Sequence, residues 1–81
     1  MIRVLYFARL RDAFGCSEEA LPAYATVAEL IAVLAARGGV WADELSPSKV
    51  FRVAVNQEMA RLQDEIPAGA EVAIFPPVTG G

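Results

Sequence analysis

Apolar residues recur along this chain with two periods, and each period predicts a different type of secondary structure. Residues 2–8 (IRVLYFA), 50–56 (VFRVAVN) and 71–75 (EVAIF) are rich in β-branched and aromatic side chains, which is typical of strands. We expect weaker strands at residues 16–21 and 59–62. The segment 16–21 is the more polar of these two, so it is predicted to lie at the edge of a sheet.

The second period indicates a helix that begins after Thr26. Four apolar residues recur there at i, i+3, i+4 and i+7, and these are Val27, Leu30, Ile31 and Leu34. Thr26 and Glu29 have the spacing of a capping box, in which each side chain binds the other residue's backbone N–H. We expect the helix to end at residues 38–39, with Arg37 in its last turn, and to pack its apolar stripe on a sheet.

Shorter helical turns are expected at residues 9–15 and within residues 40–49, and residues 67–69 predict a turn. The order of elements is then strand, short turn, strand, long helix and three further strands. Such a chain forms an α+β domain, the ubiquitin-like β-grasp, with a mixed sheet and one long helix packed on one face. We expect this domain to span residues 1–75, followed by a protruding C-terminal tail at residues 76–81.

Composition excludes several function classes. Eighty-one residues, 56% of them hydrophobic, suffice for one core. The net charge of −3 without a basic stripe argues against a nucleic-acid partner. Cys16 is the single cysteine and the chain contains no histidine, so we expect neither a metal site nor a catalytic Cys–His pair. No apolar run reaches the length of a membrane span, and the start lacks a secretion signal, so we expect a cytoplasmic protein without a membrane partner.

The C-terminal tail carries the candidate chemistry. Pro76 and Pro77 cannot donate to a sheet and favour an extended path, so the tail is expected to project from the domain. Gly80 and Gly81 lack Cβ atoms and could pass through a narrow channel. From Val72 onward the only charge is the terminal carboxylate. A slender apolar tail is what an enzyme needs to hold a C-terminus for acyl chemistry, although a frayed terminus is the simpler alternative.

The ending FPPVTGG at residues 75–81 resembles that of the sulfur-carrier subunits of molybdopterin synthase. The opening IRVLYFARLRDAFG at residues 2–15 and the VNQ at residues 55–57 are also similar to this family, as is the length. The family often has an acidic residue after the glycine of the last turn, where this chain has Gly69-Ala70-Glu71. The departure affects only the detail of that turn.

The resemblance implies that a ubiquitin-activating-like adenylyltransferase uses ATP to adenylate the carboxyl group of Gly81. A sulfur-donor enzyme would then convert it to a thiocarboxylate, so the chain carries covalent sulfur on Gly81 and binds no cofactor tightly. The tail would thread into the synthase large subunit, in a heterotetramer, and donate its sulfur to a pterin precursor. The threading residues are Pro76, Pro77, Val78, Thr79 and Gly80. On its own the chain is not expected to be an enzyme.

The alternation along the strands predicts a partner interface. If Ile2, Val4, Tyr6, Val72 and Ile74 face the helix, the opposite face carries Leu5, Phe7, Ala73 and Phe75. The first and last strands of a β-grasp sheet are neighbours, so these residues would form one apolar patch beside the tail. The expected interface residues are Leu5, Phe7, Met59 and Phe75, with Phe7 and Phe75 as anchors. Alternatively, loops of the same chain cover Leu5 and Phe7.

Three other functions stay open at this point. The chain could be a thiamine-type sulfur carrier, which shares the small β-grasp domain and the Gly-Gly ending. It could be a ubiquitin-like protein modifier, linked through Gly81 to lysine side chains. It could also be a plain binding module whose tail is inert.

Overall fold

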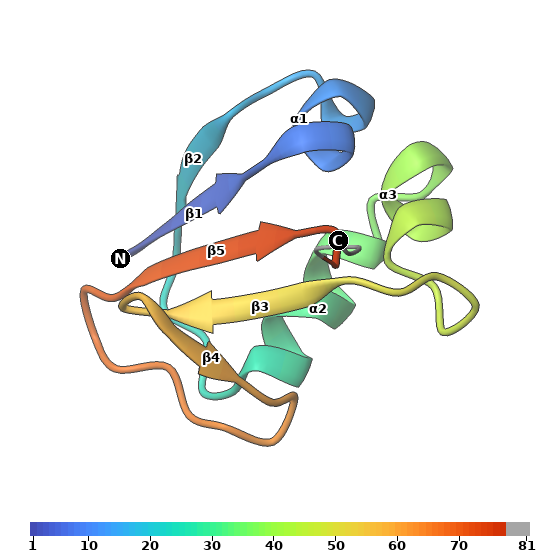
Figure 1. The fold of residues 1–81 in the computed structure, drawn as a ribbon. Coiled ribbons are helices and arrows are strands. Elements are labelled where there is room, and N and C mark those ends of the chain that lie inside the picture. Colours follow the sequence, from blue (N-terminus) through green and yellow to red (C-terminus); the bar gives the residue numbers. More distant parts are fainter. Residues whose placement is uncertain (78–81) are drawn as a thin grey trace.

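The computed structural model describes residues 1–77. Its elements are β1 (Ile2–Tyr6), α1 (Ala8–Phe14), β2 (Glu18–Leu21), α2 (Val27–Ala35), α3 (Gly39–Glu44), β3 (Arg52–Val55), β4 (Glu58–Ala60) and β5 (Glu71–Phe75). The strands form one sheet in the order β2-β1-β5-β3-β4, with α2 packed on one face (Figure 1). β1 and β5 run parallel and every other neighbouring pair is antiparallel. The predicted α+β arrangement of a mixed sheet with one longer helix is therefore confirmed, and β2 lies at an edge as expected.

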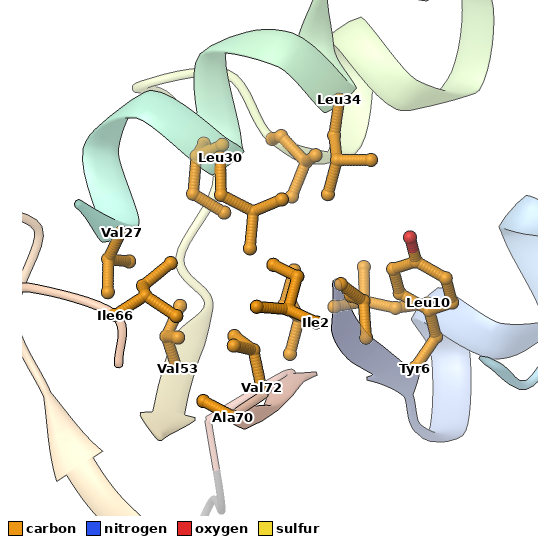
Figure 2. Packing of buried hydrophobic residues seen from close by; sticks show 14 residues of the cluster. Ile2, Tyr6, Leu10, Val27, Leu30, Leu34, Val53, Ile66, Ala70 and Val72 are labelled. Atoms are coloured by element: carbon orange, nitrogen blue, oxygen red, sulfur yellow. The ribbon is translucent and has the colours of Figure 1, made fainter. Parts of the chain in front are cut away.

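The core lies between α2 and the sheet face that it covers (Figure 2). Even-numbered positions of β1 and β5 point into it, because successive side chains of a strand alternate between faces. The buried strand residues are Ile2 (2% exposed), Val4 (0%), Tyr6 (1%), Val72 (0%) and Ile74 (0%). From α2 the predicted stripe faces them, with Val27, Leu30 and Leu34 fully buried and Ile31 8% exposed. The apolar residues of the strands and those of α2 thus pack together in one core.

The start of α2 is held from two directions. The N–H of Glu29 donates to Oγ1 of Thr26 at 3.2 Å, which confirms Thr26 as the N-cap. The N–H groups of Val27 and Ala28 donate to the carbonyls of Asp64 (3.0 Å) and Leu62 (2.8 Å). A chain segment distant in sequence therefore satisfies helix N–H groups that have no partner within the helix.

The end of α2 differs from the prediction. The helix ends at Ala35, and Arg37 lies beyond its last turn. The N–H groups of Arg37 and Gly38 bind the carbonyls three residues back, of Leu34 and Ala35, at 3.1 Å each. This tighter hydrogen bonding closes the helix before Gly38 and Gly39 (φ of 79° and 55°) turn the chain into α3.

β1 also ends earlier than predicted, at Tyr6 rather than at residue 8. The N–H of Phe7 still donates to the Ile74 carbonyl at 3.2 Å, but the N–H groups of Leu10 and Arg11 bind the Phe7 carbonyl. Phe7 is therefore the N-cap of α1. This helix ends at Gly15, which has the left-handed φ of 73° that favours glycine.

A polar bridge joins β1, β2 and the segment after α2. The Tyr6 hydroxyl donates to Oε2 of Glu19 at 2.7 Å, and Arg37 donates to both oxygens of the same carboxylate, at 2.9 and 2.8 Å. The Arg37 hydrogen bonds lower the pKa of Glu19, while burial and the bond to Glu19 raise the pKa of Tyr6. Glu19 is thus ionised and Tyr6 protonated at neutral pH, and the bridge is fully formed.

Aromatic rings extend this bridge to α1 and α3. The Arg37 guanidinium lies 4.4 Å from the centre of the Trp41 ring, in a cation–π contact. Trp41 stacks on Phe14 with ring centres 3.8 Å apart, and Tyr6 meets both rings edge to face. The two short helices are therefore fixed to the sheet through side chains rather than through the sheet's own hydrogen bonds.

Candidate functional site

The candidate site begins where β5 leaves the sheet. β5 ends at Phe75, as predicted, and Pro76 and Pro77 follow it outside any strand. Proline has no N–H, so neither residue can extend the ladder. Val78, Thr79, Gly80 and Gly81, the remaining predicted tail residues, lie outside the described residues. The division into a domain of residues 1–75 and a tail of residues 76–81 stays a prediction.

An apolar row crosses the sheet on the face opposite α2, which we call the outer face. The strand registers pair Leu5 with Ala73, Ala73 with Ala54, and Ala54 with Met59. These four residues therefore lie side by side on β1, β5, β3 and β4. Met59 is 64% exposed, whereas Ala54 is only 9% exposed.

Two phenylalanines lie between this row and the tail. Phe75 is the last residue of β5 and is half-buried. Phe7 directly follows β1, and because Tyr6 pairs with Ile74, continuing the register places Phe7 beside Phe75. Phe7 is 45% exposed, so loops of this chain cover it only in part. The structure thus brings the predicted residues Leu5, Phe7, Met59 and Phe75 to one face next to Pro76, while their role as an interface stays a prediction.

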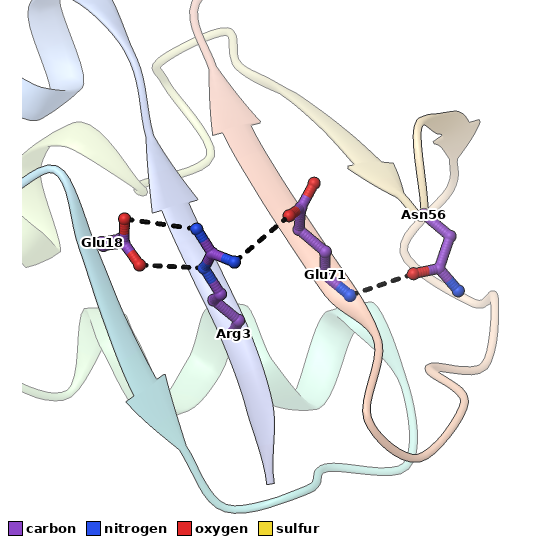
Figure 3. A network of polar contacts seen from close by, with 4 residues as sticks. All are labelled: Arg3, Glu18, Asn56 and Glu71. Atoms are coloured by element: carbon purple, nitrogen blue, oxygen red, sulfur yellow. Dashed lines mark hydrogen bonds and ion pairs between the residues drawn. The ribbon is translucent and has the colours of Figure 1, made fainter.

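At the end of the outer face away from the tail, polar side chains form ion pairs and hydrogen bonds (Figure 3). Nε of Arg3 lies 2.8 Å from Oε2 of Glu18, and its Nη1 lies 3.9 Å from the carboxylate of Glu71. Asn56 Oδ1 accepts a hydrogen bond from the N–H of Glu71 at 3.0 Å. The sequence pattern did not predict this network, although the odd-numbered positions of Arg3 and Glu71 place them on the outer face.

The charges nearer the tail are arranged differently. The carboxylate of Glu44 in α3 forms ion pairs with Nε of Arg9 in α1, at 3.1 Å, and with Nζ of Lys49, at 3.8 Å. One carboxylate therefore joins three segments. Arg52, the first residue of β3, pairs in register with Phe75. It is exposed and forms no ion pair with residues 1–77. From the sequence, Arg52 was expected only to be a polar residue of a strand.

A second apolar surface lies on the other side of the molecule, where a groove of about 600 Å³ opens between α2 and the chain leading into β3. Val50 and Leu62 contribute to its lining and are 57% and 51% exposed. The described residues that line it include no carboxylate, cysteine or histidine. The groove therefore offers no acid–base pair.

The described part of the chain also holds little reactive chemistry of its own. Within residues 1–77, no three His, Cys, Asp or Glu side chains lie close enough to hold a metal ion. Burial raises the pKa of the Cys16 thiol, which keeps it protonated at neutral pH. None of the helices between residues 1 and 77 is both long and apolar enough to cross a membrane. The reacting group predicted from the sequence, the carboxyl group of Gly81, lies outside the described residues and stays a prediction.

The model of the ThiS family matches residues 4–81, almost the whole chain and the complete tail. The chain belongs to the ThiS family. A relative from Escherichia coli, named molybdopterin synthase sulfur carrier subunit, is 40% identical over 82 residues that cover all of both chains. The predicted resemblance to the sulfur-carrier subunits of molybdopterin synthase is confirmed.

Solved structures of proteins similar to this chain have the same fold. A Pyrococcus furiosus protein described as molybdopterin converting factor, subunit 1, is 30% identical, with a TM-score of 0.75 over 95% of this chain and 97% of its own. A Helicobacter pylori chain in a complex of subunits 1 and 2 of molybdopterin-converting factor has a TM-score of 0.70 at 21% identity, covering 99% and 97%. The second likeness shows the fold alone, and together they confirm the ubiquitin-like β-grasp prediction.

Proposed function

We propose that this member of the ThiS family is the sulfur carrier of a molybdopterin synthase and that the carboxyl group of Gly81 is its reacting group. The likeness that carries the proposal is to the Escherichia coli sulfur carrier subunit, because it extends over the entire chain, tail included. The structure supports it in one respect. β5 leads directly into Pro76 and Pro77, beside an apolar face that α2 leaves uncovered. We also propose that the protein is cytoplasmic, as expected from the sequence.

The proposed chemistry needs activation, because a carboxylate is a poor electrophile. An adenylyltransferase partner joins the Gly81 carboxylate to the AMP part of ATP and releases pyrophosphate. Hydrosulfide supplied by a donor enzyme then attacks the acyl carbon and displaces AMP, which leaves a thiocarboxylate. ATP is bound by that partner, and this chain holds only the covalent sulfur. The absence of histidine from the sequence is compatible with a protein whose partners supply the acid–base groups.

We further propose that the outer face docks on the large subunit while the tail enters it, in a heterotetramer. The Helicobacter pylori neighbour is described in a complex of subunits 1 and 2, which makes such docking a reasonable model for this chain. The apolar row and the two phenylalanines are continuous with the base of the tail. Burying them would hold the tail at the entrance of the partner's channel, and exposed aromatic residues are frequent anchors of interfaces.

The sulfur-loading proposal is tested by mass spectrometry of the chain after incubation with ATP, a sulfur donor and the activating enzyme. Replacing one carboxyl oxygen by sulfur gives nearly the same mass gain as oxidation of Met1 or Met59. Fragment sequencing must therefore place the gain on Gly81. A variant lacking Gly81 is the control. No gain on Gly81 under these conditions rules the proposal out, and adducts between Gly81 and lysine side chains would favour the protein-modifier alternative.

The docking proposal is tested with Phe75→Ala. We expect affinity for the large subunit to fall by about tenfold or more, as for an aromatic anchor. The domain should stay folded, although some stability is lost because Phe75 is half-buried. Leu62→Ala is the matched control, since Leu62 is 51% exposed and lies at the groove on the other side of the sheet. Equal affinities of the two variants would remove Phe75 from the interface.

A further inference from the structure

The basic residues of this chain are almost all paired with carboxylates of the chain itself. There are seven, and six of them have an acidic partner within 4.0 Å. These six are Arg3, Arg9, Arg11, Arg37, Lys49 and Arg61. Arg52 is the exception, with neither an ion pair nor a side-chain hydrogen bond to any residue from 1 to 77. None of its five N–H donors is used by a residue from 1 to 77.

The fold determines where this available guanidinium lies. Phe51 and Val53 pack toward the core, so alternation along β3 places the Arg52 side chain on the outer face, although Arg52 also contributes to the lining of the groove beside α2. Its partner in the register is Phe75, the last strand residue before the tail. The next outer-face residue of β3 is Ala54, in the apolar row. Arg52 thus lies at the tail end of the face that we propose to dock on the large subunit.

The opposite end of the same face is arranged so that its charge is already neutralised. Arg3 there is held by Glu18 at 2.8 Å and approaches Glu71 at 3.9 Å. A partner that covered the whole outer face could bury Arg3 together with Glu18 and Glu71, which already balance its charge. Burying Arg52 without one would leave a desolvated guanidinium unpaired, which is among the most unfavourable events at an interface.

We infer that the large subunit places a carboxylate opposite Arg52, and that this ion pair fixes the orientation of the carrier at the base of its tail. The inference rests on the proposed docking and adds the chemistry that the partner surface must have there. An Asp or Glu side chain fits because guanidinium and carboxylate groups form two parallel hydrogen bonds in one plane. Such a pair resists rotation, whereas the apolar row by itself permits sliding of one surface on the other.

The test compares Arg52→Ala with Lys49→Ala in calorimetric titrations against the purified large subunit. Each substitution removes one positive charge and changes the net charge from −3 to −4, and Lys49 lies in the loop just before β3. We expect Arg52→Ala to weaken binding by about tenfold or more, as for loss of one member of an interfacial charge pair. Lys49→Ala should change it by less than about twofold, in line with surface ion pairs. Arg52→Lys should restore part of the affinity, because it returns the charge without the planar fork.

A second measurement identifies the partner group. Replacing Asp and Glu residues of the large subunit one at a time by their amides should yield one variant on which Arg52→Ala has no further effect. Equal losses from Arg52→Ala and Lys49→Ala, or no loss from either, would overturn the inference. So would disappearance of the Arg52→Ala effect when the C-terminal carboxyl group is converted to an amide, because the arginine would then serve this chain's own carboxylate. In these cases normal binding by the unsubstituted chain and sulfur gain on Gly81 would leave the proposed function standing.

Discussion

Glu19→Gln probes how one carboxylate holds together three segments of the fold. The substitution keeps the size of the side chain and one acceptor oxygen for the Tyr6 hydroxyl. It also turns an NH₂ group toward Arg37, which at present donates to both carboxylate oxygens at 2.9 and 2.8 Å. Two donors then face each other, and the cation–π contact of Arg37 with Trp41 loses its anchor. We therefore expect the segment after α2 to loosen.

The magnitude follows from the geometry and the exposure. Hydrogen bonds to charged groups contribute about 1.5–3 kcal/mol when they are well buried. The side chains of Glu19 and Arg37 are 24% and 34% exposed, so solvent screening reduces this value. We expect the free energy of unfolding to fall by about 1–2 kcal/mol. For a domain of this size the melting temperature then falls by about 5–15 °C.

The assay is thermal unfolding followed by circular dichroism, with Glu18→Gln as the control. Glu18 lies on the same strand and pairs with Arg3, but both of these side chains are at least half exposed, so the control should cost less than about 1 kcal/mol. Similar losses from the two substitutions would refute the argument that the half-buried Glu19–Arg37 pair contributes more to stability than the exposed Glu18–Arg3 pair. So would a Glu19→Gln protein that melts at the unsubstituted temperature.

The same bridge predicts a pH dependence. The pKa of Glu19 is lowered in the folded chain, chiefly by the hydrogen bonds from Arg37. The unfolded chain therefore binds a proton at higher pH than the folded chain does, and the stabilisation is complete above the ordinary glutamate pKa of about 4.3. It is lost as the pH falls through the folded-state value. The difference between Glu19→Gln and the unsubstituted chain should shrink over that acidic range, and a difference that stays constant there would contradict the assignment.

Three further predictions concern the fold. Leu34 is fully buried, so Leu34→Ala should cost about 2–5 kcal/mol in denaturant unfolding, whereas Leu62→Ala at a half-exposed position should cost much less. Thr26→Ala removes the N-cap of α2 and should cost about 1 kcal/mol by the same measurement, a value near zero counting against the cap. Gly15→Ala places a Cβ at φ 73° and should destabilise by about 1 kcal/mol, and an unchanged or raised stability would show that the helix end relaxes.

Much of the candidate site could be predicted because it depends on local pattern. Alternation alone placed Leu5 and Phe75 on the face away from the core, and the diproline marked the end of β5 at Phe75. The helix end could not be predicted in the same way. Gly38 and Gly39 indicated a stop, but the helix ends at Ala35, where N–H groups bind carbonyls three residues back, and Arg37 binds Glu19 of β2.

The order of residues along the chain is enough to establish which residues are apolar, their period and therefore their face, and the chemical character of the tail. These properties are local, because the geometry of helices and strands repeats within a few residues. The tertiary structure decided which charges meet. Arg3 and Glu18 are 15 residues apart, as are Glu71 and Asn56, and only the strand register makes them neighbours. The same register leaves Arg52 beside Phe75 with no counter-charge among residues 1–77, because pairing depends on distance in space and not along the chain.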